Sequence, residues 1–519
     1  MSPTTGEANT CWPARVSGAG RAWHDERVTG SPHEDLAYRS AGDLLVDLTA
    51  RRISSVETMA LLTERIDALD RPNGDDGLNA LIDRLADAGD EARRCDDERM
   101  RGEAVGPLHG LPVVVKDNVE VRGGRATAGS LALADRTLPD DAPLVSRLRN
   151  AGAIVIATTN LSEWANIRSG NSSSGWSAVG GQCANPWDRS RSPGGSSSGS
   201  GVAVAAGYVP LAVGTETDGS ITCPASLNGV VGIKPTVGAV PTRRVVPISS
   251  SQDSPGPLAR RVADAALMLS VMADDADLVQ RSTAIDVSAL RLGLVDQWAT
   301  GDDHTDRLAF ESVSSIARKF ARVVRVDGKA ATDAVQADEF FVLLSELRTL
   351  LDDYLSTRPD SAVRSLRDVV DFNQRNADRE LALFGQEFFE QASSTDGMRT
   401  VEYLEARRRN VEWANACFAP LWEDFDVLVA PAYAPAWTTD YAKGHSEARG
   451  GAVTTPAAIL GLPIVTIPCG LVNGLPVGVS FVGRAQSEAV LIAVASVVEA
   501  SLGLAGDDSF RPRDLGGKR

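Results

Sequence analysis

The stretch 209–229, VPLAVGTETDGSITCPASLNG, leads from an apolar run through a short polar turn into a second, partly apolar segment. The run 209–214 has the length and composition of a buried strand. Pro224 suits the first turn of a helix, and Asn228-Gly229 suits the end of one. These residues therefore predict a strand, a turn at 215–219 and a short helix in direct succession.

Other apolar runs of strand length occur along the chain, and helical patterns separate them. Such an arrangement indicates the α/β fold class, with a largely parallel or mixed sheet covered by helices on both faces. Residues 303–423 are dominated by helical patterns and are interpreted as a helical insertion over the sheet. Because strands precede and follow this insertion, one sheet completed by the C-terminus is the economical interpretation. The predicted strands are 111–115, 153–157, 291–295, 425–431, 462–468 and 475–483.

The N-terminal part is predicted to contain helices rather than strands. Helical patterns begin near residue 36, and Ser54 with Glu57 forms a capping-box pattern at the start of one helix. Residues 81–101 continue the helical pattern. Residues 1–35 contain no apolar run typical of a secretion signal, and we expect a disordered extension there, followed by a single domain over 36–519.

The overall charge works against two classes of partner. The chain has 519 residues, with 52 Lys+Arg against 69 Asp+Glu and a net charge of −17, which disfavours nucleic acid and anionic membranes. No stretch approaches eighteen uninterrupted apolar residues, so we expect a cytoplasmic protein without a membrane span. The six cysteines form no C-x-x-C pair, which argues against a zinc site or a disulfide framework.

Lysine is rare in this chain, because only six of the basic residues are lysines. Lys116 follows the apolar run 111–115, which places it at the edge of a core, where lysines are uncommon. Desolvation lowers the pKa of such a lysine and allows a neutral amine to act as a base. The alternative is a buried ion pair with Asp117 or Glu216. Lys234 competes for the same role, but its Pro-flanked turn favours a structural interpretation.

Ser220 lies where the predicted strand turns into the helix, with free backbone N–H groups around it that can bind an oxyanion. The alternative role is a helix N-cap, the commoner use of serine at such a position. A serine nucleophile needs a base, and the histidines are poor candidates. His109 is interpreted as a packed turn residue, and His304 and His445 are interpreted as surface residues.

Residues 169–201 are far richer in Gly and Ser than a connection requires. The embedded Trp176 and the apolar segments on either side favour a packed active-site loop over a flexible linker. Residues 195–199 fit the G-x-S-x-G pattern of a nucleophile elbow. No strand precedes them, however, which argues against an α/β-hydrolase.

Four segments together resemble the amidase signature family in order, spacing and flanking strands, and the similarity runs from about residue 36 to the end. Members of that family fold as one large α/β/α domain around a mixed sheet, and a Ser–cisSer–Lys triad replaces Ser–His–Asp. The segments are Gly110–Asn118, Gly194–Ser200, Gly214–Ser220 and Gly232–Thr236.

The resemblance implies a role for each residue that matches the motifs. Ser220 becomes the acyl nucleophile, Ser196 follows a cis peptide bond from Gly195 and relays a proton, and Lys116 is the base. Ser197 is implied to orient the triad, and no metal or cofactor is implied. The oxyanion is implied to bind the backbone N–H groups of Thr217, Asp218, Gly219 and Ser220.

Within the family the resemblance is strongest to bacterial peptide amidases, which convert C-terminal peptide amides to the free acid and ammonia. Many family members have Gly and Arg where this chain has Asp218 and Thr222, and Asp218 suits the peptide-amidase branch. The helical residues 303–423 would then lie near the substrate pocket. The stretches that carry this resemblance are 159–166, 174–177, 218–225, 251–253 and 383–387.

Three alternatives remain at this point. In the first, the substrate is a small aryl, aliphatic or natural-product amide. In the second, the chain is a glutamine-hydrolysing component of a tRNA-dependent amidotransferase. In the third, the chain is an inactive scaffold, which the complete triad disfavours. The expected partner is a peptide or small-molecule amide, without nucleic acid or membrane, bound by a monomer or homodimer.

Overall fold

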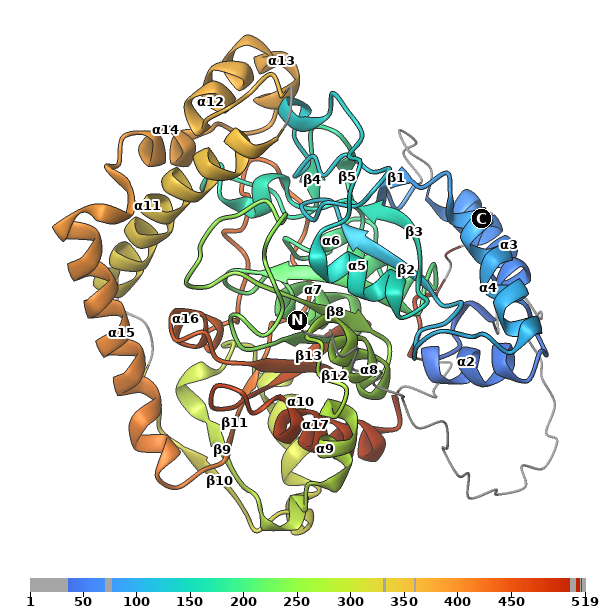
Figure 1. The fold of residues 1–519 in the computed structure, drawn as a ribbon. Helices are drawn as coiled ribbons and strands as arrows, with labels where there is room; N and C mark the ends of the chain where they lie inside the picture. The colour runs from blue at the N-terminus through green and yellow to red at the C-terminus, as the bar shows by residue number, and fades with distance from the viewer. Residues whose placement is uncertain are drawn as a thin grey trace, which may run out of the picture.

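The computed structural model describes residues 36–70, 77–329, 333–358, 361–504, 510–513 and 515. The predicted extension, residues 1–35, lies outside them. The described residues form one large α/β domain around a mixed sheet (Figure 1). None of the helices in the described part of the chain is both long and apolar enough to cross a lipid bilayer.

The described residues build an eleven-stranded sheet. Strands β3, β2 and β6 are parallel to one another, as are β11, β9 and β10, and antiparallel pairs join these two groups. In spatial order the strands are β1 (Leu81–Arg84), β3 (Ile154–Thr159), β2 (Pro112–Lys116), β6 (Leu211–Glu216), β8 (Ser254–Ala259), β7 (Val231–Lys234), β12 (Ile464–Val472), β13 (Leu475–Val482), β11 (Val427–Pro431), β9 (Arg291–Val295) and β10 (Arg322–Val326).

Helices cover both faces of the sheet and enclose separate apolar cores. One face carries α2 (Ala41–Thr49), α5 (Pro143–Asn150), α8 (Val262–Met272), α9 (Leu278–Ala284), α10 (Asp303–Ser314) and α17 (Glu488–Leu502). The other face carries α3 (Ser55–Leu69), α4 (Ala88–Arg101), α6 (Ser198–Ala205) and α7 (Thr222–Asn228), and α16 (Thr454–Ile459) lies farther along it.

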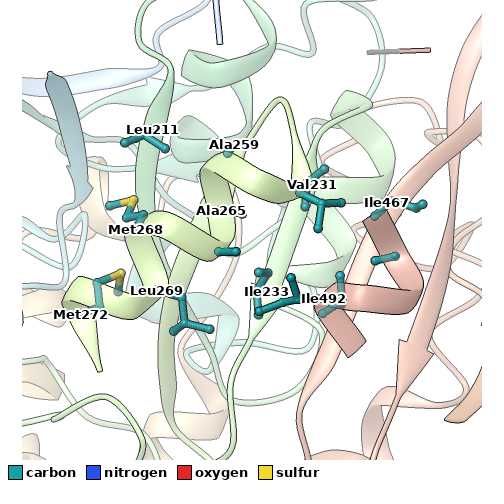
Figure 2. Close-up of a cluster of buried hydrophobic side chains, with 14 of the residues drawn as sticks. Leu211, Val231, Ile233, Ala259, Ala265, Met268, Leu269, Met272, Ile467 and Ile492 are labelled. Atoms are coloured by element: carbon teal, nitrogen blue, oxygen red, sulfur yellow. The ribbon is translucent and has the colours of Figure 1, made fainter. Parts of the chain in front are cut away.

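Figure 2 shows the first core, where Met268 of α8 lies near Leu211 of the sheet and Ile492 of α17 lies beside Ile233. Successive strand residues point to opposite faces, so the alternation along β2 determines which core each side chain enters. Val113 and Val115 enter this first core, whereas Val114 enters the second. Lys116, two residues beyond Val114, therefore points toward the face covered by α6 and α7.

The remaining helices form a group at one side of the molecule (Figure 1). They are α11 (Asp333–Thr357), α12 (Leu366–Arg375), α13 (Ala377–Glu380), α14 (Glu387–Ser393) and α15 (Val401–Trp422), called the helical section below. The range 303–423 predicted to be helical also contains strand β10, which completes the edge of the sheet. The pattern RVVRV in β10 has its two arginines at exposed positions, as an edge strand allows.

Besides β10, the strands β1, β7 and β8 of the sheet were not predicted. Residues 81–84, predicted to be helical, form the edge strand β1, because they pair with β3 before α4 begins. Strand β8 was not predicted, since prolines are disfavoured within a sheet. Pro255 and Pro257 pair only with β6, because the pairing of β7 is confined to Leu258 and Ala259.

Candidate active site

Lys116 ends β2 in the interior of the protein, with none of its side chain exposed. Its Nζ atom lies 2.8 Å from Oγ of Ser196, 2.9 Å from Oγ1 of Thr215 and 3.3 Å from the carbonyl oxygen of Thr215. Within the described residues no carboxylate lies within ion-pair distance of Nζ. The alternative of a buried ion pair with Asp117 or Glu216 is therefore not what the structure shows.

The surroundings of Lys116 suit a neutral amine. Burial lowers the pKa of Lys116 from 10.5 to about 7, while the charges of Asp253 and Glu216 oppose this effect. A neutral amine has two N–H groups and one lone pair. It can donate both N–H groups to Thr215 and accept the hydroxyl hydrogen of Ser196, which matches the three neighbours of Nζ.

Ser196 and Ser197 lie just before α6, in the predicted Gly/Ser-rich loop, and both are fully buried. The peptide bond between Gly195 and Ser196 is cis. Ser197 joins this loop to β6 and to the turn that follows β6. Its N–H donates to the carbonyl oxygen of Ser220 at 3.1 Å, and its hydroxyl donates to the carbonyl oxygen of Thr215 at 3.0 Å. Backbone hydrogen bonding therefore brings the Ser196 loop and Ser220 together.

Ser220 lies in the turn between β6 and α7 and is 7% exposed. The helix N-terminus is capped by Glu216, whose Oε2 accepts the N–H groups of Ile221 at 2.7 Å and Thr222 at 2.8 Å. Among the described residues the Ser220 hydroxyl has no hydrogen-bond partner. The structure therefore assigns the capping role to Glu216 and leaves the Ser220 hydroxyl free to react.

The turn also presents unpaired backbone donors. Within the described chain, the N–H groups of residues 217–220 donate to no other group. Gly219 has φ +80°, and a Cβ atom there would lie 2.6 Å from the hydroxyl of Tyr433. Glycine is therefore required where the turn bends toward Ser220. Free N–H groups beside a serine hydroxyl are the geometry of an oxyanion hole.

The Gly/Ser-rich segment 169–201 is packed into the protein, which supports the loop interpretation over a flexible linker. Trp176 is 8% exposed, and its ring packs against Phe384 of the helical section at 5.0 Å. Asn185 is fully buried and donates to the carbonyl oxygens of Ser192 and Leu227.

None of the other candidate bases in the described residues forms a hydrogen bond with Ser220. The interpretation of His109 is confirmed: it is 5% exposed and its Nε2 lies 2.9 Å from the carbonyl oxygen of Cys95. Lys234 is structural, since its Nζ donates to the carbonyl oxygen of Leu462 at 2.8 Å. His304 is exposed, as predicted.

The surface interpretation of His445 is wrong. Its Nε2 lies 2.6 Å from the Ser174 hydroxyl, and its ring packs edge-on against Trp437. Burial lowers the pKa of His445 to about 4, so the imidazole is neutral at physiological pH. The sequence pattern missed this contact because residues 174 and 445 are far apart in the chain.

Asp218 meets the helical section at this turn. Its carboxyl group hydrogen-bonds that of Glu339 on α11 and accepts the Thr455 hydroxyl at 2.7 Å. Burial raises the pKa of both carboxyl groups, and the charge of Asp218 raises that of Glu339 further. The side chain of Asp218 thus joins the helical section to the turn that carries Ser220.

One cluster outside the site brings together possible metal ligands. The side chains of Cys95, Glu98 and His109 place their donor atoms within 4.8 Å of one another. Both ring nitrogens of His109 are already engaged, with the N–H of Val105 and the carbonyl oxygen of Cys95. Burial also raises the pKa of the Cys95 thiol to about 11, which disfavours the thiolate that a metal requires.

Three residues of the site were not predicted to take part. Thr215 binds the Lys116 amine, Asn118 donates to Thr215 Oγ1 at 3.0 Å, and Asp253 accepts the hydroxyl of Thr217 at 2.6 Å. Asn118 follows the predicted base by two residues, which is a signal the sequence contains. The approach of Asp253 depends on tertiary contacts alone.

Comparison with known proteins gives a consistent result. A family model described as Amidase matches residues 63–492. A probable amidase of Arabidopsis thaliana is 33% identical over 483 residues, covering 88% of each chain. A component chain of the glutamyl-tRNA(Gln) amidotransferase of Salinispora tropica is 33% identical over 506 residues, covering 90% of this chain and 98% of that one.

Solved structures of similar proteins include the native peptide amidase of Stenotrophomonas maltophilia. It is 41% identical in sequence, with a TM-score of 0.83 over 89% of this chain and 97% of that chain. The structure of the peptide amidase PAM with the competitive inhibitor chymostatin gives a TM-score of 0.84 at 41% identity, over 90% of this chain and 98% of that chain.

Proposed function

This chain belongs to the amidase family and is an amide-hydrolysing enzyme, and on that premise we propose that it removes the C-terminal amide of peptides as ammonia. The observation that carries the chemistry is the buried Lys116 amine, 2.8 Å from the Ser196 hydroxyl and beside the turn of Ser220. The choice of substrate is supported by the 41% identity with peptide amidases over about nine-tenths of the chain.

In the acylation step, the neutral amine of Lys116 takes the hydroxyl proton of Ser196, while Ser196 takes the proton of Ser220. The Ser220 oxygen forms a bond to the carboxamide carbon, and the carbonyl electrons move to its oxygen. The N–H groups of Thr217, Asp218, Gly219 and Ser220 stabilise this oxyanion. The proton then passes to the departing nitrogen, the C–N bond breaks and ammonia leaves.

In the deacylation step, water replaces ammonia. The Lys116 amine accepts a proton from water through Ser196, and the water oxygen attacks the acyl carbon. The second tetrahedral intermediate collapses, Ser220 recovers its proton and the free acid departs. Ser197 keeps its backbone N–H on the Ser220 carbonyl throughout, which holds the nucleophile in register with the relay.

A second candidate is glutamine hydrolysis within an amidotransferase assembly. Its support is the 33% identity with the glutamyl-tRNA(Gln) amidotransferase component of Salinispora tropica over 90% of the chain. The net charge of −17 and the long helical section weigh against it, since the sequence has no basic cluster of its own for RNA. Hydrolysis of small aryl or aliphatic amides is the remaining alternative.

The test is ammonia release from a panel of peptide amides, arylamides, aliphatic amides and free glutamine, with the purified Ser220→Ala variant as the blank. We expect turnover of peptide amides, with the highest kcat/KM in the panel. Turnover of glutamine alone would favour the amidotransferase role. Turnover of small amides without any peptide amide would overturn the proposed substrate while leaving the amidase chemistry in place.

A further inference from the structure

Asp253 ends the loop 248–253, directly before strand β8. Its Oδ2 atom accepts the N–H groups of Ile248 at 2.9 Å and Ser249 at 3.0 Å. Its Oδ1 atom accepts the hydroxyl of Thr217 at 2.6 Å. Thr217 begins the turn that carries Ser220, so this one carboxylate connects a separate loop to that turn.

The loop that carries Asp253 is itself fixed by the helical section. Glu346 of α11, which is fully buried, accepts the hydroxyls of Ser249 at 2.7 Å and Ser251 at 2.8 Å. The same carboxylate accepts the hydroxyl of Tyr403 on α15 at 2.8 Å. Two sets of hydrogen bonds therefore fix Asp253: those it accepts from backbone N–H groups, and those that join its loop to Glu346.

Asp253 also lies across a small cavity from the residues around Lys116. The cavity has a volume of about 10 Å³, enough for roughly one water molecule, and its lining includes Asn118, Thr215, Thr217 and Asp253. Thr215 binds the Lys116 amine on the far side. Lys116, Asn118 and Thr215 are buried and Asp253 is half-buried, so solvent screens the charge of Asp253 at Lys116 only in part.

We propose that Asp253 is a positioning residue of this site, which anchors Thr217 at the start of the oxyanion turn and presents a negative charge to Lys116 across the cavity. The inference rests on the proposed function in one respect, that Lys116 acts as the base for Ser220. The carboxylate touches neither substrate nor nucleophile and acts through these two neighbours.

The other charged groups nearby are already engaged. Glu216 at the end of β6 faces the N-terminus of α7 and the charge of Lys234. Asp117 accepts the N–H and hydroxyl of Thr127. Glu346 on α11 binds the serine hydroxyls described above. Of the charges acting on the pKa of Lys116, that of Asp253 is the largest and that of Glu216 follows.

The sign of the effect follows from electrostatics. A negative Asp253 favours the protonated form of Lys116 and raises its pKa, opposing the effect of burial, so the wild-type amine loses its proton near pH 7. Removing the charge lowers the pKa further. The reaction then retains its active, neutral base at lower pH, and the acid limb of its pH profile moves down by about 1 unit.

The experiment measures the pH dependence of Ser220 phosphonylation by an alkyl fluorophosphonate, a probe that does not depend on the amide substrate. The Ser220 oxygen forms a bond to phosphorus, the P–F bond breaks, fluoride leaves, and the serine proton passes to Lys116. Asp253→Asn is the main variant, because the amide oxygen can accept the two N–H groups while its NH₂ donates to the Thr217 oxygen.

We expect the acid limb to shift down by about 1 pH unit in Asp253→Asn and to stay at the wild-type position in Asp253→Glu, which keeps the charge. Asp253→Ser serves as a second charge-removing variant should the asparagine protein not fold. Asp70→Asn is the matched control, since Asp70 is a buried carboxylate that accepts two backbone N–H groups and also has a pKa raised to about 6.

An acid limb that stays in place when the charge is removed, or that moves equally in Asp70→Asn, overturns the inference. A purely structural role for Asp253 would lower the plateau rate at high pH without moving the limb. If Ser220 of the wild type is not labelled at any pH while the protein is folded, the proposed triad fails, and the inference fails with it. The two failures are thus told apart by the wild-type control.

Discussion

Lys116 is a side chain whose burial works against the stability of the fold. Burial lowers its pKa from 10.5 to about 7 because the protonated amine loses its hydration. The folded state therefore releases the proton at a pH where the unfolded chain still holds it. Below pH 7 the burial of Lys116 lowers the free energy of unfolding by its full amount. This loss shrinks as the pH rises toward 10.5, the pKa of the lysine in the unfolded chain.

The substitution Lys116→Met tests this pH dependence. At 1.36 kcal/mol for each unit of pKa, the wild type should gain about 3 kcal/mol of stability relative to the variant between pH 7 and pH 9. The measurement is urea unfolding of both proteins at a series of pH values. A stability difference that does not change with pH would show that Lys116 is charged throughout the folded state.

Ser220→Ala and Lys116→Ala test the roles of nucleophile and base. We expect Ser220→Ala to lower kcat for peptide-amide hydrolysis by at least about 10³-fold and Lys116→Ala by a similar factor, since the members of a triad act as a unit. Stability should hardly change in Ser220→Ala, because among the described residues its hydroxyl bonds to nothing. Full activity in either variant would remove that residue from the mechanism.

At the scale of elements, the turn between β6 and α7 depends on a carboxylate rather than on the serine beside it. Glu216 satisfies two N–H groups at the start of α7, and this cap determines where the Ser220 turn sits relative to β6. The cap therefore serves both the stability of the helix and the position of Ser220.

Glu216→Ala should lower the stability by about 2 kcal/mol, the upper range for a lost helix cap, and lower kcat more than it changes KM. Kinetics on a peptide amide and thermal unfolding measure both effects. Glu57→Ala is the control, because Glu57 completes the exposed capping box of α3. It should lose about 1 kcal/mol of stability with unchanged kcat; an equal loss of kcat in both variants would argue against a special role of the α7 cap.

Helix α6, which follows Ser196 and Ser197, approaches the sheet too closely for a side chain at Gly199. A Cβ atom there would lie 2.2 Å from the carbonyl oxygen of Ala80 and 2.6 Å from that of Asn160, both of them backbone atoms. The approach holds the start of α6 against β1 and β3. Close packing against the backbone therefore requires a glycine at position 199, apart from any role of the loop in the reaction.

We expect Gly199→Ala to destabilise the protein by about 1–3 kcal/mol, the usual cost of overpacking, and to reduce the rate of acylation by moving Ser196. Gly89→Ala is the matched control, since Gly89 lies on the exposed side of α4 and a Cβ there meets only the side chain of Arg93. Gly89→Ala should raise the free energy of unfolding by up to about 1 kcal/mol, because alanine favours the helix more than glycine does. Denaturant unfolding distinguishes the two, and equal stabilities would contradict the close approach.

At the scale of the whole molecule, the helical section is joined to the sheet by buried charges. Arg168 is fully buried, and its guanidinium lies 2.6 Å from Glu163 and 3.5 Å from Glu380 of α13. It also lies over the ring of Phe384 at 4.3 Å. Together with Glu339 and Glu346 of α11, these contacts connect the section to the Gly/Ser-rich loop, to the loop 248–253 and to the turn that carries Ser220.

Arg168→Met should lower the stability by about 3–5 kcal/mol, because it removes the buried cation that lies between Glu380 and Glu163, although burial already raises the pKa of Glu163. We also expect faster proteolysis within 333–422 under native conditions, since the anchor of the helical section is lost. Arg408→Met is the control: its pair with Glu412 is exposed and should change stability by less than about 1 kcal/mol. A stable, protease-resistant Arg168→Met protein would contradict the anchoring role.

Local sequence was enough to predict the strands around the site and the turn that carries Ser220. Apolar runs led to β2, β3, β6, β9, β11, β12 and β13, because a buried strand needs a continuous apolar segment. Four strands were not predicted: the short β7, β8 with its prolines, and the edge strands β1 and β10. Their place depends on the strands they pair with. The family resemblance is confirmed, since a model of the Amidase family matches residues 63–492.

The sequence by itself determined the family and the α/β fold class, and through the family resemblance it predicted the residues of the site, because motif spacing and apolar periodicity are local properties of the chain. Only the tertiary structure decided what surrounds them. The three neighbours of the Lys116 amine, the cap by Glu216 and the approach of Asp253 to Thr217 join segments from different strands and loops. The protonation of a buried lysine depends on those neighbours and on desolvation, which exist only once the chain has folded.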